Sequence, residues 1–152
     1  FNTSGGLGTL CESLAGKVEN LNYKTVRYPG HRDIVKMLIR DLELGKIERR
    51  AILKDVLETS IPMTKQDVVL VFVSVVGMRA GRLEQESYAK KIYAQEVNGR
   101  LLSAIQLTTA AGICAMVDLL IEAKLPQQGF VRQEQATFSD FTSNRFGRYY
   151  AN

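Results

Sequence analysis

The sequence predicts an α+β fold, in which a mixed and largely antiparallel sheet carries helices packed on it. Three features indicate this: the apolar, β-branched run DVVLVFVSVVGM in the middle of the chain, an Asn98-Gly99 pair between two strand-like segments, and stretches of helical periodicity on both sides. The chain has 152 residues, which is enough for one domain over residues 1–152 to bury its own core. The expected order of elements is β-α-α-β-β-β-α-β-α.

The first third of the chain predicts one strand and two helices behind a glycine-rich start. NLNYKTVRY, residues 20–28, alternates well enough for a strand, and Pro29-Gly30 ends it with a turn. RDIVKMLIRDLEL, residues 32–44, has the apolar spacing of a helix with a glycine as its stop. A second helix is expected over residues 47–57, before Pro62.

The middle of the chain predicts a three-stranded antiparallel meander from Asp67 to Leu107. DVVLVFVSVVGM is apolar on both faces, which is typical of a central strand covered on both sides. LEQESYAKKIYAQEV is more polar, so this strand should have one solvated face, and the Asn98-Gly99 pair should turn the chain into the strand RLLSAIQL. The flat meander with its Lys90-Lys91 pair is a candidate for a sheet edge or for the contact in a homodimer.

The last third predicts a buried helix, a short extended piece and a final helix. Thr108 and Thr109 are candidate N-caps for the apolar helix AAGICAMVDLLIEA. GFVRQE should be extended, and TFSDFTSNRFG should form a short helix. Asp118 stands within the apolar helix, where a buried acid must be paired or neutral, and a partially exposed helix face is the favoured interpretation.

Composition excludes several classes of function. The net charge is +4 and the isoelectric point is near 9.1, but basic residues are interleaved with acids, so we predict no nucleic-acid partner. No segment reads as long and apolar enough to span a membrane. Cys11 and Cys114 are too few for a metal cluster and favour reduced thiols in a cytoplasmic protein, although a bridge between them stays open.

Two stretches offer side chains for ligand binding. The glycine-rich start lacks the Lys-Ser/Thr of a P-loop and the spacing of a dinucleotide fingerprint, so it is either a plain turn or a nest of amides for a carboxylate or phosphate. Arg27, beside Tyr28, is either paired with an acid or recognises a carboxylate through its guanidinium fork. His31 is the only histidine and has no second metal ligand nearby, so it is either a surface residue at a helix start or a substrate contact and proton handler.

These landmarks resemble a known family. FNTSGGLGTL followed by LNYKTVRYPGH, and the closing LPQQGFVRQE with DFTSNRFGRYY, look like the C-terminal half of the saccharopine dehydrogenase family. That family includes saccharopine dehydrogenases, lysine 6-dehydrogenases and carboxynorspermidine dehydrogenases. The resemblance covers nearly the whole chain.

The resemblance implies a C-terminal domain that shapes the substrate site and forms a homodimer, with the N-terminal Rossmann domain absent from this chain. The implied reaction oxidises the C–N bond of an amino acid such as saccharopine or lysine, and NAD or NADP, bound mainly by the missing domain, accepts the hydride. A non-catalytic ligand-binding or dimerisation module with the same fold is the alternative. By itself the chain is expected not to catalyse hydride transfer.

The resemblance also implies roles for particular residues. The substrate-binding residues it implies are Asn2, Thr3, Ser4, Gly5, Gly6, Arg27, Tyr28 and His31. Arg132 and Glu134, which flank Gln133, would lie toward the nucleotide-binding domain and contact the cofactor. The resemblance assigns no proton acceptor, and no metal is expected.

Overall fold

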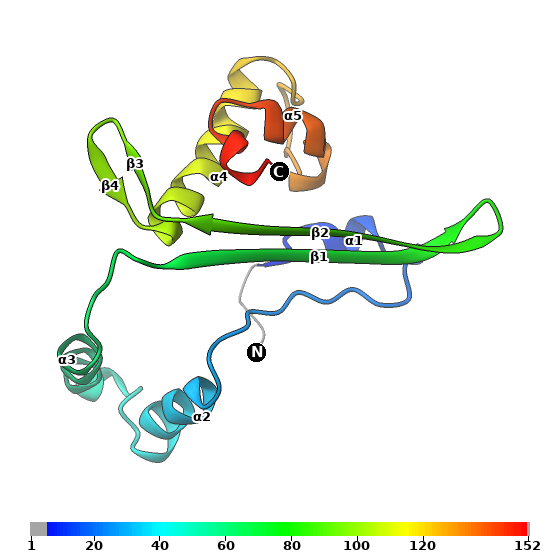
Figure 1. Cartoon of the computed structure of the whole chain (residues 1–152). Coiled ribbons are helices and arrows are strands. Elements are labelled where there is room, and N and C mark those ends of the chain that lie inside the picture. Colours follow the sequence, from blue (N-terminus) through cyan, green and yellow to red (C-terminus); the bar gives the residue numbers. More distant parts are fainter. Residues whose placement is uncertain (1–5, 152) are drawn as a thin grey trace. The chain divides into compact units, whose positions relative to one another are not determined.

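The computed structural model describes residues 6–151, and the chain divides into two compact units, Phe1–Met63 and Thr64–Asn152 (Figure 1). Helices together with antiparallel strands confirm the predicted α+β class. Cys11 and Cys114 both carry free thiols, so the bridge left open by the sequence is not formed.

The described part of the first unit consists of helices joined by irregular segments. Its helices are α1 (Leu10–Ser13), α2 (His31–Lys36), which continues as a π-helical turn (Met37–Asp41), and α3 (Arg50–Ser60), which follows a 3₁₀ turn (Ile47–Arg49). Both predicted helices are therefore confirmed. The strand predicted over residues 20–28 is wrong, because this stretch pairs with no strand among residues 6–151 and has no ladder of hydrogen bonds. Alternating side chains cannot form a strand without a partner.

A long β-hairpin opens the second unit. β1 (Val68–Arg79) pairs antiparallel with β2 (Arg82–Tyr93), from Val68 opposite Tyr93 to Arg79 opposite Arg82. Ala80 and Gly81 both have positive φ, +50° and +78°, as a two-residue primed turn requires.

A second, separate hairpin follows. β3 (Gln95–Val97) pairs with β4 (Arg100–Leu102), and the predicted turn at Asn98-Gly99 is confirmed, with φ of +50° and +74°. The predicted three-stranded meander is wrong, because the strands form two two-stranded sheets.

The helix after these strands begins earlier than predicted. α4 (Ala104–Ile121) starts at Ser103, whose Oγ accepts from the Gln106 backbone N–H at 3.3 Å while Gln106 Oε1 accepts from the Ser103 N–H at 3.1 Å. The carboxylate of Asp67 accepts two further N–H groups of this first turn, from Ala104 at 2.6 Å and Ile105 at 3.0 Å. Desolvation would raise the pKa of Asp67, but these backbone hydrogen bonds outweigh it and lower the pKa. RLLSAIQL is thus not one strand, since its second half is capped into a helix.

The core of the second unit forms around α4. One side of the helix is buried, through Ala104, Leu107, Ala111, Ala115 and Leu119. Figure 1 shows α4 and α5 (Phe138–Ser143) on the same side of the long hairpin. β1 is therefore not covered on both faces, and that prediction is wrong. GFVRQE is not a strand either, because its end forms a 3₁₀ turn (Gln133–Gln135).

α4 also corrects the prediction that no segment is apolar enough to span a membrane. By length and composition alone this helix qualifies. In the second unit it packs as a core helix, with its buried side against the C-terminal segment, where Tyr150 Oη donates to Thr108 O at 2.8 Å.

Candidate functional site

Gly6, the first described residue of the chain, lies against the stretch that leads to RYPGH. A Cβ placed on Gly6 would lie 2.2 Å from Cδ1 of Tyr23, so only glycine allows the backbone to approach this ring so closely. Asn2, Thr3, Ser4 and Gly5 lie outside the described residues. Gly6 therefore meets a residue that lies seventeen positions further along the chain.

The RYPGH segment forms a tight turn at the start of α2. The His31 N–H donates to Tyr28 O at 3.1 Å, and Gly30 between them has φ of +84°, a conformation that favours glycine. Arg27 and Tyr28 precede the turn with exposed side chains. Among residues 6–151 Arg27 forms no ion pair, which leaves its guanidinium accessible to a carboxylate ligand.

His31 lies at an open hollow of about 250 Å³ on α2 and the π-helical turn that follows. The hollow is lined by His31, Arg32, Val35, Lys36, Ile39 and Arg40. Arg32 forms an ion pair with Asp33 at 2.7 Å. The other basic residues of the hollow, Lys36 and Arg40, lie beside its apolar residues, Val35 and Ile39. Such a surface suits an anionic group with an aliphatic part. The signal for this cluster in the sequence is the repeat of basic residues at positions 32, 36 and 40, a helical spacing that places them on one face.

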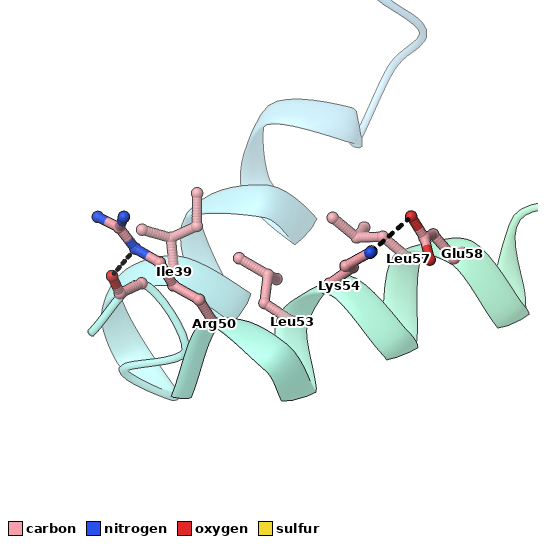
Figure 2. A pocket seen from close by; sticks show the side chains of 7 residues that line it. Ile39, Arg50, Leu53, Lys54, Leu57 and Glu58 are labelled. Atoms are coloured by element: carbon pink, nitrogen blue, oxygen red, sulfur yellow. Dashed lines mark hydrogen bonds and ion pairs between the residues drawn. The ribbon is translucent and has the colours of Figure 1, made fainter. Parts of the chain in front are cut away.

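A second open hollow, of about 550 Å³, lies between the π-helical turn and α3 (Figure 2). Ile39, Leu53 and Leu57 supply apolar surface, and two polar contacts lie beside them. Lys54 Nζ is 3.9 Å from Glu58 Oε1, and Arg50 Nε donates to Gly45 O at 3.3 Å. The polar groups here bond one another or the backbone, so the hollow resembles a packing seam more than a reaction centre.

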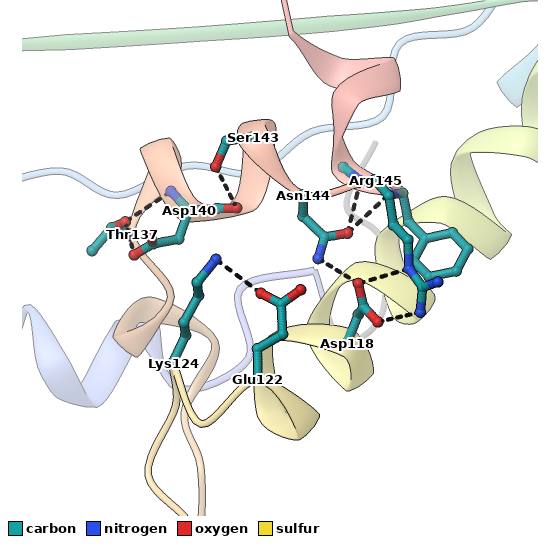
Figure 3. Close-up of polar contacts among 10 residues, drawn as sticks. Asp118, Glu122, Lys124, Thr137, Asp140, Ser143, Asn144 and Arg145 are labelled. Carbon is teal, nitrogen blue, oxygen red and sulfur yellow. Dashed lines mark hydrogen bonds and ion pairs between the residues drawn. The ribbon is translucent and has the colours of Figure 1, made fainter.

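The strongest polar cluster of the second unit is structural (Figure 3). The carboxylate of Asp118 accepts from Arg145 Nε at 3.0 Å, from Arg145 Nη2 at 2.6 Å and from Asn144 Nδ2 at 2.8 Å. The side chain of Asp118 is 6% exposed, whereas that of Arg145 is 71% exposed. The favoured interpretation of Asp118 as a partially exposed residue is therefore wrong, and it is a buried acid with partners. Asn144 Oδ1 also accepts from the Phe146 N–H at 2.8 Å, so the cluster ties the C-terminal turn to α4.

This pairing makes stability depend on pH. The hydrogen bonds from Arg145 lower the pKa of Asp118, burial opposes them, and Asn144 adds to the lowering. A lowered folded-state pKa contributes stability that is present above the unfolded-state value and is lost as pH falls through the folded-state value. We therefore expect wild type to melt several degrees above Asp118→Asn near neutral pH, and the gap to narrow when thermal melts are repeated down to about pH 2.

Glu122→Gln is the matched control, one turn further along. Glu122 pairs with Lys124 at 2.8 Å, but both side chains are nearly half exposed, so its removal should change the melting temperature little at any pH. A gap between wild type and Asp118→Asn that stays constant with pH would contradict the role given to the Asp118 carboxylate.

The two residues predicted to contact the cofactor lie at the 3₁₀ turn Gln133–Gln135. The Arg132 N–H donates to Gln135 Oε1 at 2.7 Å, which closes the turn. Arg132 is exposed and Glu134 is partly exposed. They belong to the second unit, whereas Arg27 and His31 belong to the first. An exposed guanidinium such as that of Arg132 has the chemistry to bind a nucleotide phosphate.

Within the described residues, no group of three or more His, Cys, Asp or Glu side chains could hold a metal ion. Tyr88 and Tyr150 both have raised pKa values because burial disfavours the phenolate, and each donates to a backbone carbonyl. Both phenols are therefore engaged in packing.

Comparison with known proteins does not add a family. No family model matches the chain, and no solved structure matches it. The resemblance to the saccharopine dehydrogenase family stays a prediction from the quoted motifs.

Proposed function

We propose that this chain is the C-terminal, substrate-binding and dimerisation part of an NAD(P)-dependent oxidoreductase that acts on the C–N bond of an amino acid such as saccharopine or lysine. The observation that supports the proposal is the close approach of Gly6 to the ring of Tyr23, a residue of the stretch that leads to RYPGH. The resemblance requires these two segments to share one substrate site. A cytoplasmic location belongs to the same proposal.

In this proposal the chain binds and orients the substrate. The guanidinium of Arg27 and the amides of the glycine loop hold a carboxylate of the amino acid. His31, the first residue of α2, is the proposed substrate contact and proton handler. When NAD(P) is bound, it accepts the hydride from the carbon next to the amine nitrogen, and water then opens the resulting imine. Arg132 and Glu134 are proposed to face the nucleotide.

The test is NAD(P)H formation by the full-length protein with lysine, saccharopine and carboxynorspermidine, beside an Arg27→Ala variant. Loss of a bidentate guanidinium–carboxylate contact should raise KM about 10- to 100-fold with a smaller effect on kcat. Arg100→Ala, an exposed arginine of the second unit, is the control and should leave both constants unchanged. Unaltered kinetics of Arg27→Ala in an active enzyme would remove Arg27 from the substrate site.

A non-catalytic ligand-binding or dimerisation module is the second candidate. The observation that favours it is the long hairpin of the second unit, which exposes a large apolar surface. Absence of turnover with every substrate and both cofactors, in a folded full-length protein, would favour this candidate.

A further inference from the structure

The two faces of the long hairpin differ in what covers them. Residues directly opposite each other in an antiparallel pair point to the same face, and successive residues alternate. The inner face holds Tyr88, Lys90 and Ile92. Tyr88 Oη donates to Tyr150 O, Lys90 Nζ donates to Ala151 O, and Ile92 is buried, so the C-terminal turn covers this face.

The opposite face, here called the outer face, is largely apolar and exposed. Its large side chains are Val68, Leu70, Phe72, Val76, Met78, Leu83 and Tyr93. Each of them is between 42 and 72% exposed. In the middle lie three polar side chains that bond one another: Gln85 Nε2 donates to Ser74 Oγ at 3.1 Å and to Ser87 Oγ at 3.3 Å, and the two hydroxyls are 3.2 Å apart.

The distribution of charged residues indicates which parts of the hairpin are solvated. Where the inner face extends toward the turn, it carries Arg79, whose guanidinium contacts Glu86 at 2.8 Å and Glu84 at 3.3 Å. Over the whole length of the hairpin, the outer face carries one charged residue, Lys91 near its end. The solvated face of a strand normally carries polar residues. The outer face carries mostly apolar residues, so it has the composition of a buried surface.

The exposed apolar area of the outer face is as large as that of a stable protein–protein interface. Aromatic side chains each bury roughly 150–250 Å² and large aliphatic ones somewhat less, so the seven partly exposed side chains of the outer face present on the order of 800 Å². This matches the roughly 800 Å² that each partner buries in an interface of standard size.

We propose that the outer face is the surface through which a second copy of this chain docks. This inference rests on the proposed function, in which the chain forms a homodimer, and it assigns that role to the outer face. A two-fold interface requires a surface that complements itself, and here Ser74 and Ser87 stand opposite each other at the middle of the register. In a face-to-face pair of hairpins, the polar centre of one copy meets that of the other, so the buried hydroxyl and amide groups keep hydrogen-bond partners. The apolar ends then pack on each other, and Lys91 stays at the rim.

Two neighbouring valines make a matched test. Val76 lies on the outer face and is 59% exposed, whereas Val75 lies on the inner face beyond the C-terminal turn and is 64% exposed. The full chain carrying Val76→Glu or Val75→Glu is compared with wild type by sedimentation velocity over a concentration series, without substrate or cofactor. We expect wild type and Val75→Glu to be dimeric. Val76→Glu should be a folded monomer, with a dimer constant weakened at least about 100-fold, because each interface would bury two unpaired carboxylates.

Three outcomes would overturn the proposal. A monomeric wild type means that the outer face is covered within one chain or by a different partner. A Val76→Glu variant that stays dimeric means that the dimer uses another surface. Equal dissociation of both variants means that the effect is not specific to the outer face. Circular dichroism shows that each variant is folded, and because the readout needs no turnover, an inactive but dimeric protein would count against the proposed reaction alone.

Discussion

Replacing Gly147 with alanine is expected to destabilise the second unit by about 3 kcal/mol. A Cβ on Gly147 would lie 1.7 Å from the carbonyl oxygen of Phe141 and 2.7 Å from its carbonyl carbon. These are backbone atoms at the end of α5, so no side-chain rotation relieves the overlap. The clash would push apart α5 and the 3₁₀ turn Gly147–Tyr150, which carries Tyr150 onto α4. Urea unfolding followed by circular dichroism measures the loss.

Gly112→Ala is the control, because it makes the same chemical change in the opposite setting. Gly112 lies inside α4, and a Cβ there would meet only Tyr150 Oη, at an ordinary 3.6 Å. Alanine is the better helix former by about 1 kcal/mol, so this variant should be as stable as wild type or slightly more stable. Similar losses in the two variants would show that the close approach at Gly147 is not what restricts that position.

The sequence predicts the helices and the short turns of this fold well, because their signals are local. The periodicity of residues 32–44 predicts a helix, the Asn98-Gly99 pair predicts a turn, and both elements are present. Strand pairing depends on a partner that the segment itself does not contain. Residues 20–28 alternate but find no partner among the described residues, and LEQESYAKKIYAQEV, the middle strand of the predicted meander, does not join its two expected neighbours in one sheet.

The start of α4 does carry a local signal in the sequence. Ser103-Ala-Ile-Gln106 is a capping box, and it predicts a helix start five residues before Thr108. The apolar residues after the capping box are equally compatible with the continuation of a strand. Asp67 strengthens the helix start from a distance of 37 residues, and such a contact is not visible in a local pattern.

The candidate site shows the same division between local and distant signals. The close approach to Tyr23 explains why position 6 is a glycine, and the positive φ in the RYPGH turn explains why position 30 is a glycine. Neither observation by itself identifies a reaction. The local pattern around Asp118 does not reveal its pairing, because its neighbours along the helix are apolar while its partners Asn144 and Arg145 come from the far end of the chain. A buried acid therefore predicts that partners exist without telling where they are.

Leu119→Ala should also cost the second unit about 3 kcal/mol, within the range of about 2–5 kcal/mol for leucine-to-alanine changes in cores. Leu119 is fully buried, and it lies between Asp118, which is tied to the C-terminal turn, and the end of α4. Because Asp118 holds this part of α4 to the C-terminal turn, the cavity cannot readily collapse, and the loss should include the cavity contribution as well as the lost burial. Urea unfolding of the full chain, with the slope compared between variants, gives the change in free energy of unfolding.

Leu120→Ala removes the same atoms from the next residue and separates burial from helix propensity. Leu120 is 39% exposed, so its truncation should cost less than about half as much as that of Leu119. If α4 were instead held by its apolar composition alone, as a helix in a membrane would be, the two leucines would count alike, and the two variants would lose similar stability. A clear difference between them would show that the side of α4 that carries Leu119 is packed in a protein core, which is the setting in which the Asp118 pair is stable.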